Sequence, residues 1–395
     1  MAESTPSATS VGTVSTSHFP RLDGLRGMAA LMVAGSHAAM LWAPGGSWGR
    51  ADALVIGALG YGWTGVVLFF VLSGWLLSLP FWRDGVGDLA EFSRRRIGRV
   101  LPLFWFQVAL FALLLALSLP MPGLQANAVI GDVGWQALMA FRLTPDAPGA
   151  WMSVWWTLPL ELSFYLILPL LFLLPLRLRW PSLIALLMLA PLLRATMALG
   201  WLGGPWARVL IDQLPARIDL FVIGVIAAGL WVQRGEWLTR LSAPVWRWLG
   251  VGGLWSLVLG SVWLGVISPV AVPRSVPLAA WQTLFAGLAA CWIIGCCLPA
   301  AAASQAGSGF SGSWPMRWLG RLSFSIYLWH FPVFMALRPW MRQLIDQPWQ
   351  LLPALLLAML PVLALSYLSW RLIEAPARDW VRHGGRKPAA SRAPA

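Results

Sequence analysis

Residues 21–42 read RLDGLRGMAALMVAGSHAAMLW, a charged start followed by an apolar run that contains one histidine. From Gly27 onward this run is long enough to cross most of a bilayer as a helix. Hydrocarbon offers an imidazole no solvent, so His37 needs polar partners, and titratable groups at such a depth usually have a function. Arg26 precedes His37 by about three helical turns, nearly along the same helix face. The stretch predicts an active site inside a membrane protein, with the arginine at the membrane surface and the histidine deeper.

The composition of the whole chain points to the same class of protein. Of 395 residues, 58% are hydrophobic and only 11% are charged, whereas soluble domains carry about 25% charged residues. Because a backbone in lipid must satisfy its own hydrogen bonds, the apolar runs predict helices. We therefore expect an all-α, polytopic membrane bundle of about ten transmembrane helices. The expected spans are approximately 26–43, 60–80, 100–119, 155–175, 181–201, 216–233, 246–267, 278–298, 319–338 and 350–370.

The basic residues predict the orientation of this bundle. The net charge is +13, but the arginines lie mostly between apolar runs, which indicates membrane topology rather than binding to nucleic acid. With the N-terminus inside, 20 of the 28 basic residues fall on the cytoplasmic side, so both termini are expected there. The predicted organisation is a disordered cytoplasmic arm over 1–19, one integral-membrane domain over 20–380 and a basic disordered tail over 381–395.

Other residues that could bind metal or protons give weaker signals. His330 lies in SFSIYLWHFP, residues 323–332, where we expect a structural or substrate-orienting role, with the hydroxyls of Ser323 and Tyr327 as partners. The alternative for either membrane histidine is a purely structural role, in which the ring makes a hydrogen bond to a neighbouring helix. Three cysteines fall on one predicted helix at a spacing that fits no zinc motif, so packing is expected and no metal site. They are Cys291, Cys296 and Cys297.

The densest cationic cluster is SRRRIGRVLP, residues 93–102. Four arginines at the start of a membrane helix can act simply as a topological stop. Arg96 and Arg99 are three residues apart, so they share a helix face, and guanidinium groups match phosphate oxygens. Taken alone, the cluster favours the role of a topological stop over that of a phosphate site. Its combination with His37 favours a site for an anionic cofactor.

Acidic and small residues inside apolar runs complete the set of candidates. Glu161, in WWTLPLELSFY (155–165), is costly in a membrane unless paired, so it is expected to orient His37, to hold an arginine or to form a purely structural ion pair. Ser73 and Gly74 predict close helix packing. Glu374 is expected to pair with an arginine at the cytoplasmic surface.

In this order the motifs resemble those of the integral-membrane acyltransferase-3 family, which includes O-antigen, exopolysaccharide and peptidoglycan O-acetylases and macrolide acyltransferases. The matching strings are RLDGLRG (21–27) with His37, FFVLSG (69–74), RIGRVLP (96–102), WTL (156–158) with Glu161 and Tyr165, SIYLWHFP (325–332) and EAP (374–376). The resemblance covers residues 20–380.

This resemblance implies a bacterial inner-membrane enzyme that moves an acyl group from cytoplasmic acyl-CoA, foremost acetyl-CoA, to a hydroxyl of a carbohydrate or glycolipid. It implies catalytic roles for Arg26, His37 and Glu161, with Asp23 nearby. Arg96 and Arg99 match the Arg-x-x-Arg pair of the family. Together with Arg26 and Ser73 they are expected to contact the acyl-CoA, and Tyr327 and His330 are expected to orient the substrate. Val67 stands where many members carry an acidic residue, which puts the substrate preference in doubt. Some relatives add an extracytoplasmic hydrolase-like domain, so transfer here is expected within the membrane domain or through a separate partner.

The resulting hypothesis places the CoA phosphates against Arg96 and Arg99 and makes His37 the general base towards the acceptor hydroxyl, with a transient acyl-histidine as a variant. Arg26 lies near the thioester and could stabilise the oxyanion. One alternative is a transporter or exporter in which His37 and Glu161 relay protons. Another is a non-catalytic scaffold of a glycan-assembly complex. A macrolide-type small molecule is an alternative acceptor.

Overall fold

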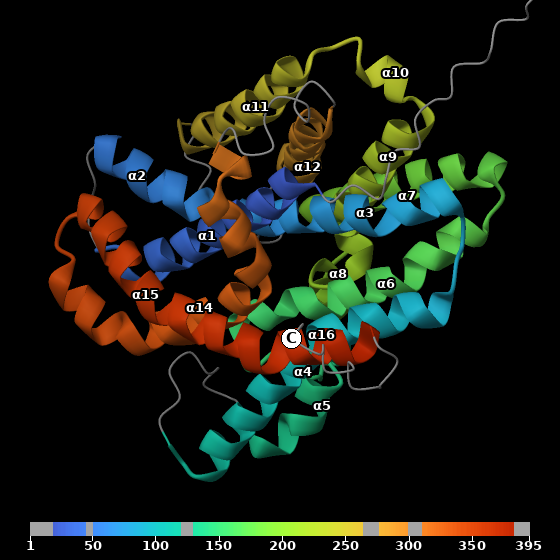
Figure 1. Ribbon diagram of the computed structural model, residues 1–395. Helices are drawn as coiled ribbons and strands as arrows, with labels where there is room; N and C mark the ends of the chain where they lie inside the picture. Colours follow the sequence, from blue (N-terminus) through green and yellow to red (C-terminus); the bar gives the residue numbers. More distant parts are fainter. Residues whose placement is uncertain (1–18, 45–49, 120–128, 264–275, 299–309, 383–395) are drawn as a thin grey trace, which may run out of the picture.

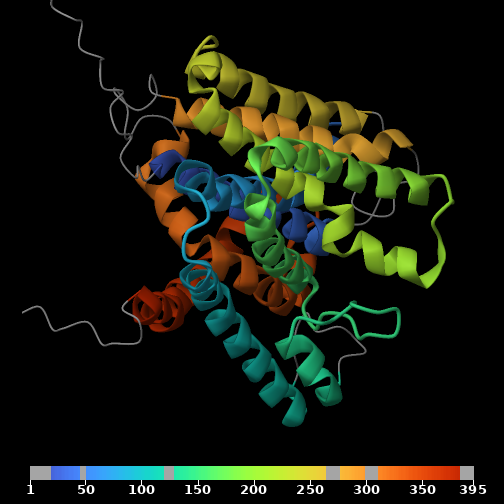
Figure 2. The same cartoon turned by 90° about the vertical axis from the view of Figure 1, so that its right-hand side faces the viewer.

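The computed structural model describes residues 19–44, 50–119, 129–263, 276–298 and 310–382, and these residues form helices and no β-strand (Figure 1, Figure 2). The long helices are α1 (Pro20–Trp42), α3 (Thr64–Asp84), α4 (Leu89–Ala116), α6 (Thr157–Leu173), α7 (Leu176–Ala198), α9 (Ile218–Gln233), α11 (Ala243–Trp263), α12 (Val276–Cys297), α14 (Trp314–Leu344) and α15 (Leu351–Ser369). Shorter α-helices are α2 (Arg50–Gly60), α5 (Val133–Ala137), α8 (Gly204–Ile211), α10 (Gly235–Leu238) and α16 (Ala375–Arg382). Single turns are η1 (Tyr61–Trp63), η2 (Ile130–Asp132), η3 (Ser153–Trp156), η4 (Leu214–Ala216), η5 (Phe310–Gly312), η6 (Pro348–Gln350) and the π-helical η7 (Trp370–Glu374).

The all-α membrane architecture predicted from the sequence is confirmed. Each predicted span overlaps one long helix, and seven stretches of the described residues are long and apolar enough to cross a membrane. These are Val55–Asp84, Leu89–Ala116, Ser153–Leu173, Leu176–Ala198, Ala243–Val262, Ala279–Cys297 and Pro348–Val381. Of the remaining helices, α9 is short, and α1 and α14 carry arginine and histidine side chains along their length. The predicted arm and tail lie almost entirely outside the described residues.

Helix α1 lies in the interior of the bundle, where it contacts α3, α14, α15 and α12. Its approach to α14 depends on glycines from both helices. A Cβ atom added to Gly27 would lie 2.5 Å from the carbonyl oxygen of Met316, and one added to Gly320 would lie 1.9 Å from that of Asp23. Small residues allow helix backbones to approach this closely in membranes. The interior position of α1 explains how a helix with several charges is accommodated.

The contact between α3 and α9 follows the same principle. A Cβ atom on Gly74 would lie 2.0 Å from the carbonyl oxygen of Phe221, so the expected close packing at Gly74 is confirmed. Beside it, Phe221 stacks on Phe70 and Phe164, with ring centroids 4.5 and 4.4 Å apart. This aromatic stack joins α3, α6 and α9 into one body.

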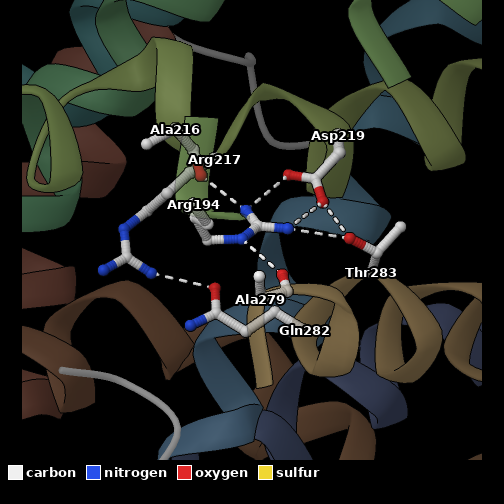
Figure 3. A network of polar contacts seen from close by, with 7 residues as sticks. All are labelled: Arg194, Ala216, Arg217, Asp219, Ala279, Gln282 and Thr283. Carbon is white, nitrogen blue, oxygen red and sulfur yellow. Dashed lines mark hydrogen bonds and ion pairs between the residues drawn. The ribbon is translucent and has the colours of Figure 1, made fainter. Parts of the chain in front are cut away.

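A buried network of charged side chains links α7, η4, α9 and α12 (Figure 3). Arg194 is only 2% exposed, and it donates to both carboxylate oxygens of Asp219 and to the hydroxyl of Thr283. It also donates to the carbonyl oxygens of Ala279 and Ala216. With its guanidinium saturated by hydrogen bonds, Arg194 is a structural clamp rather than a ligand-binding group.

Arg217 lies beside this network and is also buried (Figure 3). It donates to the side chain of Gln282 at 3.0 Å, and its guanidinium lies 4.8 Å from the ring centre of Trp156. The positive charge is therefore stabilised by an aromatic face and an amide.

The two ends of the bundle differ in the elements they carry. Figure 2 shows α16, in red, at one end and α8, in yellow-green, at the other. The start of α4 lies at the α16 end, because a Cβ atom on Gly98 would lie 2.5 Å from a side-chain carbon of Val381. In the vertical direction of Figure 1, α11 and α12 form one edge, α4 and α5 form the other, and α1 and α3 lie between them.

Candidate active site

A narrow slot of about 80 Å³ runs inside the bundle between α1, α3, α4, α6 and α14. On α3 its lining extends from Val66 to Leu77, which corresponds to about 16 Å along the helix axis. Because the slot has so small a volume over that length, it fits a ligand with a thin, extended shape better than a ligand with a ring. The polar or charged lining residues are Arg26, Ser73, Arg96, Arg99, Thr157, Glu161, Tyr165, Ser323 and Tyr327.

Three arginines make one end of the slot cationic. Arg26 comes from α1, while Arg96 and Arg99 come from the first turns of α4, at the α16 end of the bundle. The guanidinium of Arg96 lies 5.5 Å from the ring centre of Phe92, and its Nε is buried without a hydrogen-bond partner among the described residues. A buried donor that lacks a partner is costly. The arrangement therefore offers both positive charge and an unused hydrogen bond to an anionic ligand.

The acidic residues near these arginines are bonded to hydroxyl groups. Glu161 accepts a hydrogen bond from Tyr165 one turn later on α6, and the charges of Glu161 and Arg96 interact. Glu374 was expected to pair with an arginine at the surface. Its charge does interact with those of Arg378 and Arg99, but the side chain is buried and accepts a hydrogen bond from Ser325. The slot lining holds three arginines and one carboxylate, so this end of the slot keeps an excess of positive charge.

Tyr327 lies at the other end of the slot. Its hydroxyl donates to the carbonyl oxygen of Val154 at 2.7 Å and accepts from the hydroxyl of Thr157 at 3.0 Å. Its ring contacts Phe69 on the slot side and His330 on the other, with centroids 6.4 and 5.8 Å apart. Tyr327 therefore lies between the slot and His330, the next polar residue along α14.

Just beyond Tyr327, two histidines from distant parts of the chain face each other. His330 Nε2 lies 3.0 Å from His37 Nδ1, and the ring centroids are 5.0 Å apart. His330 is fully buried, whereas His37 is partly buried and packs edge-on against Phe331. The partner of His37 is thus a second imidazole. Glu161, which was considered for orienting it, is bonded to Tyr165 instead.

The structure brings most of the predicted site residues into one region. Those that line the slot are Arg26, Ser73, Arg96, Arg99, Glu161 and Tyr327, and His37 and His330 form the pair beyond it. Asp23 lies on the first turns of α1, where its backbone packs against Gly320, and it is not among the lining residues. The side chains of Ser323 and Tyr327 were expected to satisfy His330, but its ring nitrogens face Ile326 and His37. Sequence reasoning did not give Thr157 a role, and an isolated threonine at a helix start carries no distinguishing signal.

A second and larger cleft, of about 820 Å³, lies at the α8 end of the bundle. Its polar lining includes Arg142, Thr144, Asp146 and Asp212, and Arg142 forms an ion pair with Asp212. The backbone of Arg142 is in the left-handed region, with φ of 53°. Such conformations are unfavourable for non-glycine residues and cluster at functional sites.

No group of three or more histidine, cysteine or acidic side chains suited to hold a metal ion occurs in the described parts of the chain.

Residues 19–371 match the Acyl_transf_3 family model, described as an acyltransferase domain. The chain belongs to the acyltransferase-3 family.

Curated relatives of this acyltransferase-3 protein match over nearly its whole length. YrhL of Bacillus subtilis is 28% identical over 388 residues, covering 91% of this chain and 55% of that protein. Peptidoglycan O-acetyltransferase OatA of Listeria monocytogenes is 26% identical, covering 92% of this chain and 56% of its own. O-acetyltransferase OatA of Staphylococcus aureus is 24% identical, covering 91% and 57%. The chain therefore spans a little over half the length of these relatives. No solved structure matches it.

Proposed function

We propose that this protein is a multi-pass membrane enzyme that transfers an acyl group, in the first instance acetyl, from acyl-CoA to a hydroxyl of a carbohydrate or glycoconjugate. The observation that carries the proposal is the slot itself, which leads from three arginines towards a histidine pair about 16 Å away along the bundle. All three relatives described above carry the name O-acetyltransferase, and two of these names specify peptidoglycan. Peptidoglycan is accordingly the first acceptor to test, and a macrolide-type small molecule is the alternative.

The cationic end of the slot would hold the phosphates of acyl-CoA. Arg96 and Arg99 supply guanidinium forks on one helix face, and the partnerless Nε of Arg96 supplies a donor. Arg26 and His37 are about 16 Å apart along α1, so Arg26 cannot reach a reacting carbonyl beside His37. We therefore assign Arg26 to the phosphate end, beside the other two arginines, rather than to the oxyanion.

At the opposite end His37 would act as general base. It would take the proton of the acceptor hydroxyl as the oxygen attacks the thioester carbonyl carbon. The new C–O bond forms, the C–S bond breaks, and the proton passes from His37 to the departing thiolate, which restores the neutral imidazole. Ser73 and Tyr327 line the path that the donor arm would follow. Asp23 precedes Arg26 by three residues on α1 and would support its position.

The acceptor would bind in the larger cleft. Small-molecule sites usually have volumes of about 300–1,000 Å³, a range that includes the cleft but not the slot. Ala150 of the cleft is four residues from Val154, which holds the Tyr327 hydroxyl, so the two positions are at most about 14 Å apart. The donor and the acceptor would thus approach the histidines from opposite ends of the bundle.

In the membrane we propose about ten spans with both termini in the cytoplasm, in the inner membrane of a bacterium. The basic residues support this orientation, because it places the slot arginines on the cytoplasmic side where acyl-CoA is found. Membrane lipids would surround the bundle. The cleft would then face the extracytoplasmic side.

The transporter alternative requires a proton path between His37 and Glu161. Their hydrogen bonds run to different partners, His330 and Tyr165, which gives no such path. The scaffold alternative gives no reason for three arginines to line one buried slot. Acyl transfer accounts for both observations.

The test is release of free CoA from acetyl-CoA by the purified protein in lipid vesicles, with and without peptidoglycan glycan fragments. We expect acceptor-dependent release that His37→Ala abolishes. Met40→Ala is the matched control, since Met40 lies on the same helix but is 60% exposed. Normal release by His37→Ala would exclude the proposed base, and movement of substrate without acetyl-CoA consumption would indicate a transporter.

A further inference from the structure

The contacts of the two histidines determine where their protons lie. His330 Nδ1 is 2.9 Å from the carbonyl oxygen of Ile326, and His37 Nδ1 is 3.1 Å from that of Val33. A carbonyl oxygen only accepts hydrogen bonds, so each Nδ1 carries a hydrogen. A neutral imidazole has one N–H, which leaves both Nε2 atoms as acceptors.

The contact between the rings is then defined. His37 Nδ1–H donates to His330 Nε2 at 3.0 Å, and the same hydrogen is shared with the Val33 carbonyl. Neither nitrogen of His330 is left for a substrate, because one donates to Ile326 and the other accepts from His37. His37 keeps one free lone pair, on Nε2.

The surroundings of His330 hold it in this arrangement. Its side chain is fully buried, and its ring contacts Tyr327 and Phe334 with centroids 5.8 and 5.9 Å away. Tyr327 is itself held by two hydrogen bonds. A buried ring with both nitrogens bonded has a single orientation, whereas partly buried His37 depends on its partner for its own.

We propose that His330 is a positioning residue that fixes His37 in the tautomer with Nδ1 protonated and Nε2 free, ready to accept a proton. This assignment rests on the proposed role of His37 as base, and it replaces the expectation that His330 orients the substrate. When His37 becomes an imidazolium, its Nδ1–H faces the lone pair of His330, which stabilises the new charge. Groups that hold a catalytic histidine in one tautomer act in this way without touching the substrate.

The first test compares two replacements of His330 by kcat and by KM for acetyl-CoA. His330→Gln keeps an oxygen acceptor near the position of Nε2, whereas His330→Leu keeps only the bulk. We expect kcat to fall about 100-fold in the leucine variant and less than about tenfold in the glutamine variant, as is typical for outer partners of active histidines. KM for acetyl-CoA should stay within about twofold in both. Leu344→Ala, exposed at the end of α14, serves as the control.

The outcomes separate this inference from the proposed function. An active His37→Ala variant would overturn both. An inactive His37→Ala variant together with a fully active His330→Leu variant would overturn only the role of His330, and so would equal losses in the leucine and glutamine variants.

A second test needs no substitution at His330. The chain has four histidines, so ¹⁵N-histidine labelling of the protein in bilayers gives few signals, and loss of a signal in His37→Asn assigns His37. We expect a protonated Nδ1 and an unprotonated Nε2 for His37. The opposite tautomer would refute the inference even if the variants fail to fold.

Discussion

Replacing Gly62 with alanine tests whether the position of one turn of α1 sets the catalytic rate. Gly62 lies in η1 against α1, and a Cβ atom there would be 2.0 Å from the carbonyl oxygen of Met32 and 3.3 Å from the amide nitrogen of Ser36. Real Cβ contacts are essentially never closer than 3.0 Å, so the two segments must separate by about 1 Å. The turn that moves is the one directly before His37. The His37–His330 hydrogen bond, now 3.0 Å long, tolerates only about 0.5 Å before it is lost.

We expect Gly62→Ala to lower kcat about 100-fold, the usual effect of a 1 Å misplacement of a reacting group. KM for acetyl-CoA should change by less than about twofold, because the arginines lie at the end of the slot that is farther from this turn. The assay is release of free CoA by equal amounts of protein in vesicles. Gly60→Ala is the matched control, since a Cβ atom at Gly60 meets nothing within 4 Å. A Gly62→Ala variant with the wild-type kcat would refute the dependence of the reaction on this spacing.

Three further changes test other parts of the molecule. Asp219→Asn leaves the Arg194 guanidinium buried without its carboxylate partner, so we expect the free energy of unfolding to fall by about 3–5 kcal/mol. The measurement is the Tm in detergent, and an unchanged Tm would contradict the structural role of this ion pair. Arg96→Gln removes a positive charge and a hydrogen-bond donor from the slot, so KM for acetyl-CoA should rise about tenfold with little change in kcat. An unchanged KM would mean that acetyl-CoA binds elsewhere. Asp146→Asn in the larger cleft should raise KM for the glycan acceptor and leave KM for acetyl-CoA unaltered, whereas equal changes in both would argue against separate sites.

The helices could be predicted from the sequence because hydropathy is a local property of the chain. Every long helix was anticipated as a span, but the limits differ where charged residues extend a helix beyond the apolar run. The helix that overlaps the predicted span 100–119 runs from Leu89 to Ala116, and Asp88 caps its start by accepting hydrogen bonds from the amides of Ala90 and Glu91. The predicted span 319–338 is part of a helix that runs from Trp314 to Leu344.

The grouping of the arginines was also foreseeable, since Arg96 and Arg99 are near in sequence and the motif pointed to an anionic ligand. The partners of the buried polar groups were not. His37 and His330 are 293 residues apart, and Ser325 and Glu374 are 49 residues apart. Which helices adjoin depends on packing at sites such as Gly27 and Gly320, and a single sequence does not state which small residues meet.

The hydrogen-bonded chain that starts at His37 ends at the carbonyl oxygen of Ile326. A peptide oxygen cannot take up and release protons at physiological pH, so a proton on His37 cannot travel onward through His330. An imidazole pair in the middle of an energised membrane would otherwise be an obvious leak for the ion gradient across it. The base that we propose therefore exchanges protons only through Nε2 of His37, and the pair gives an ion gradient no path through His330.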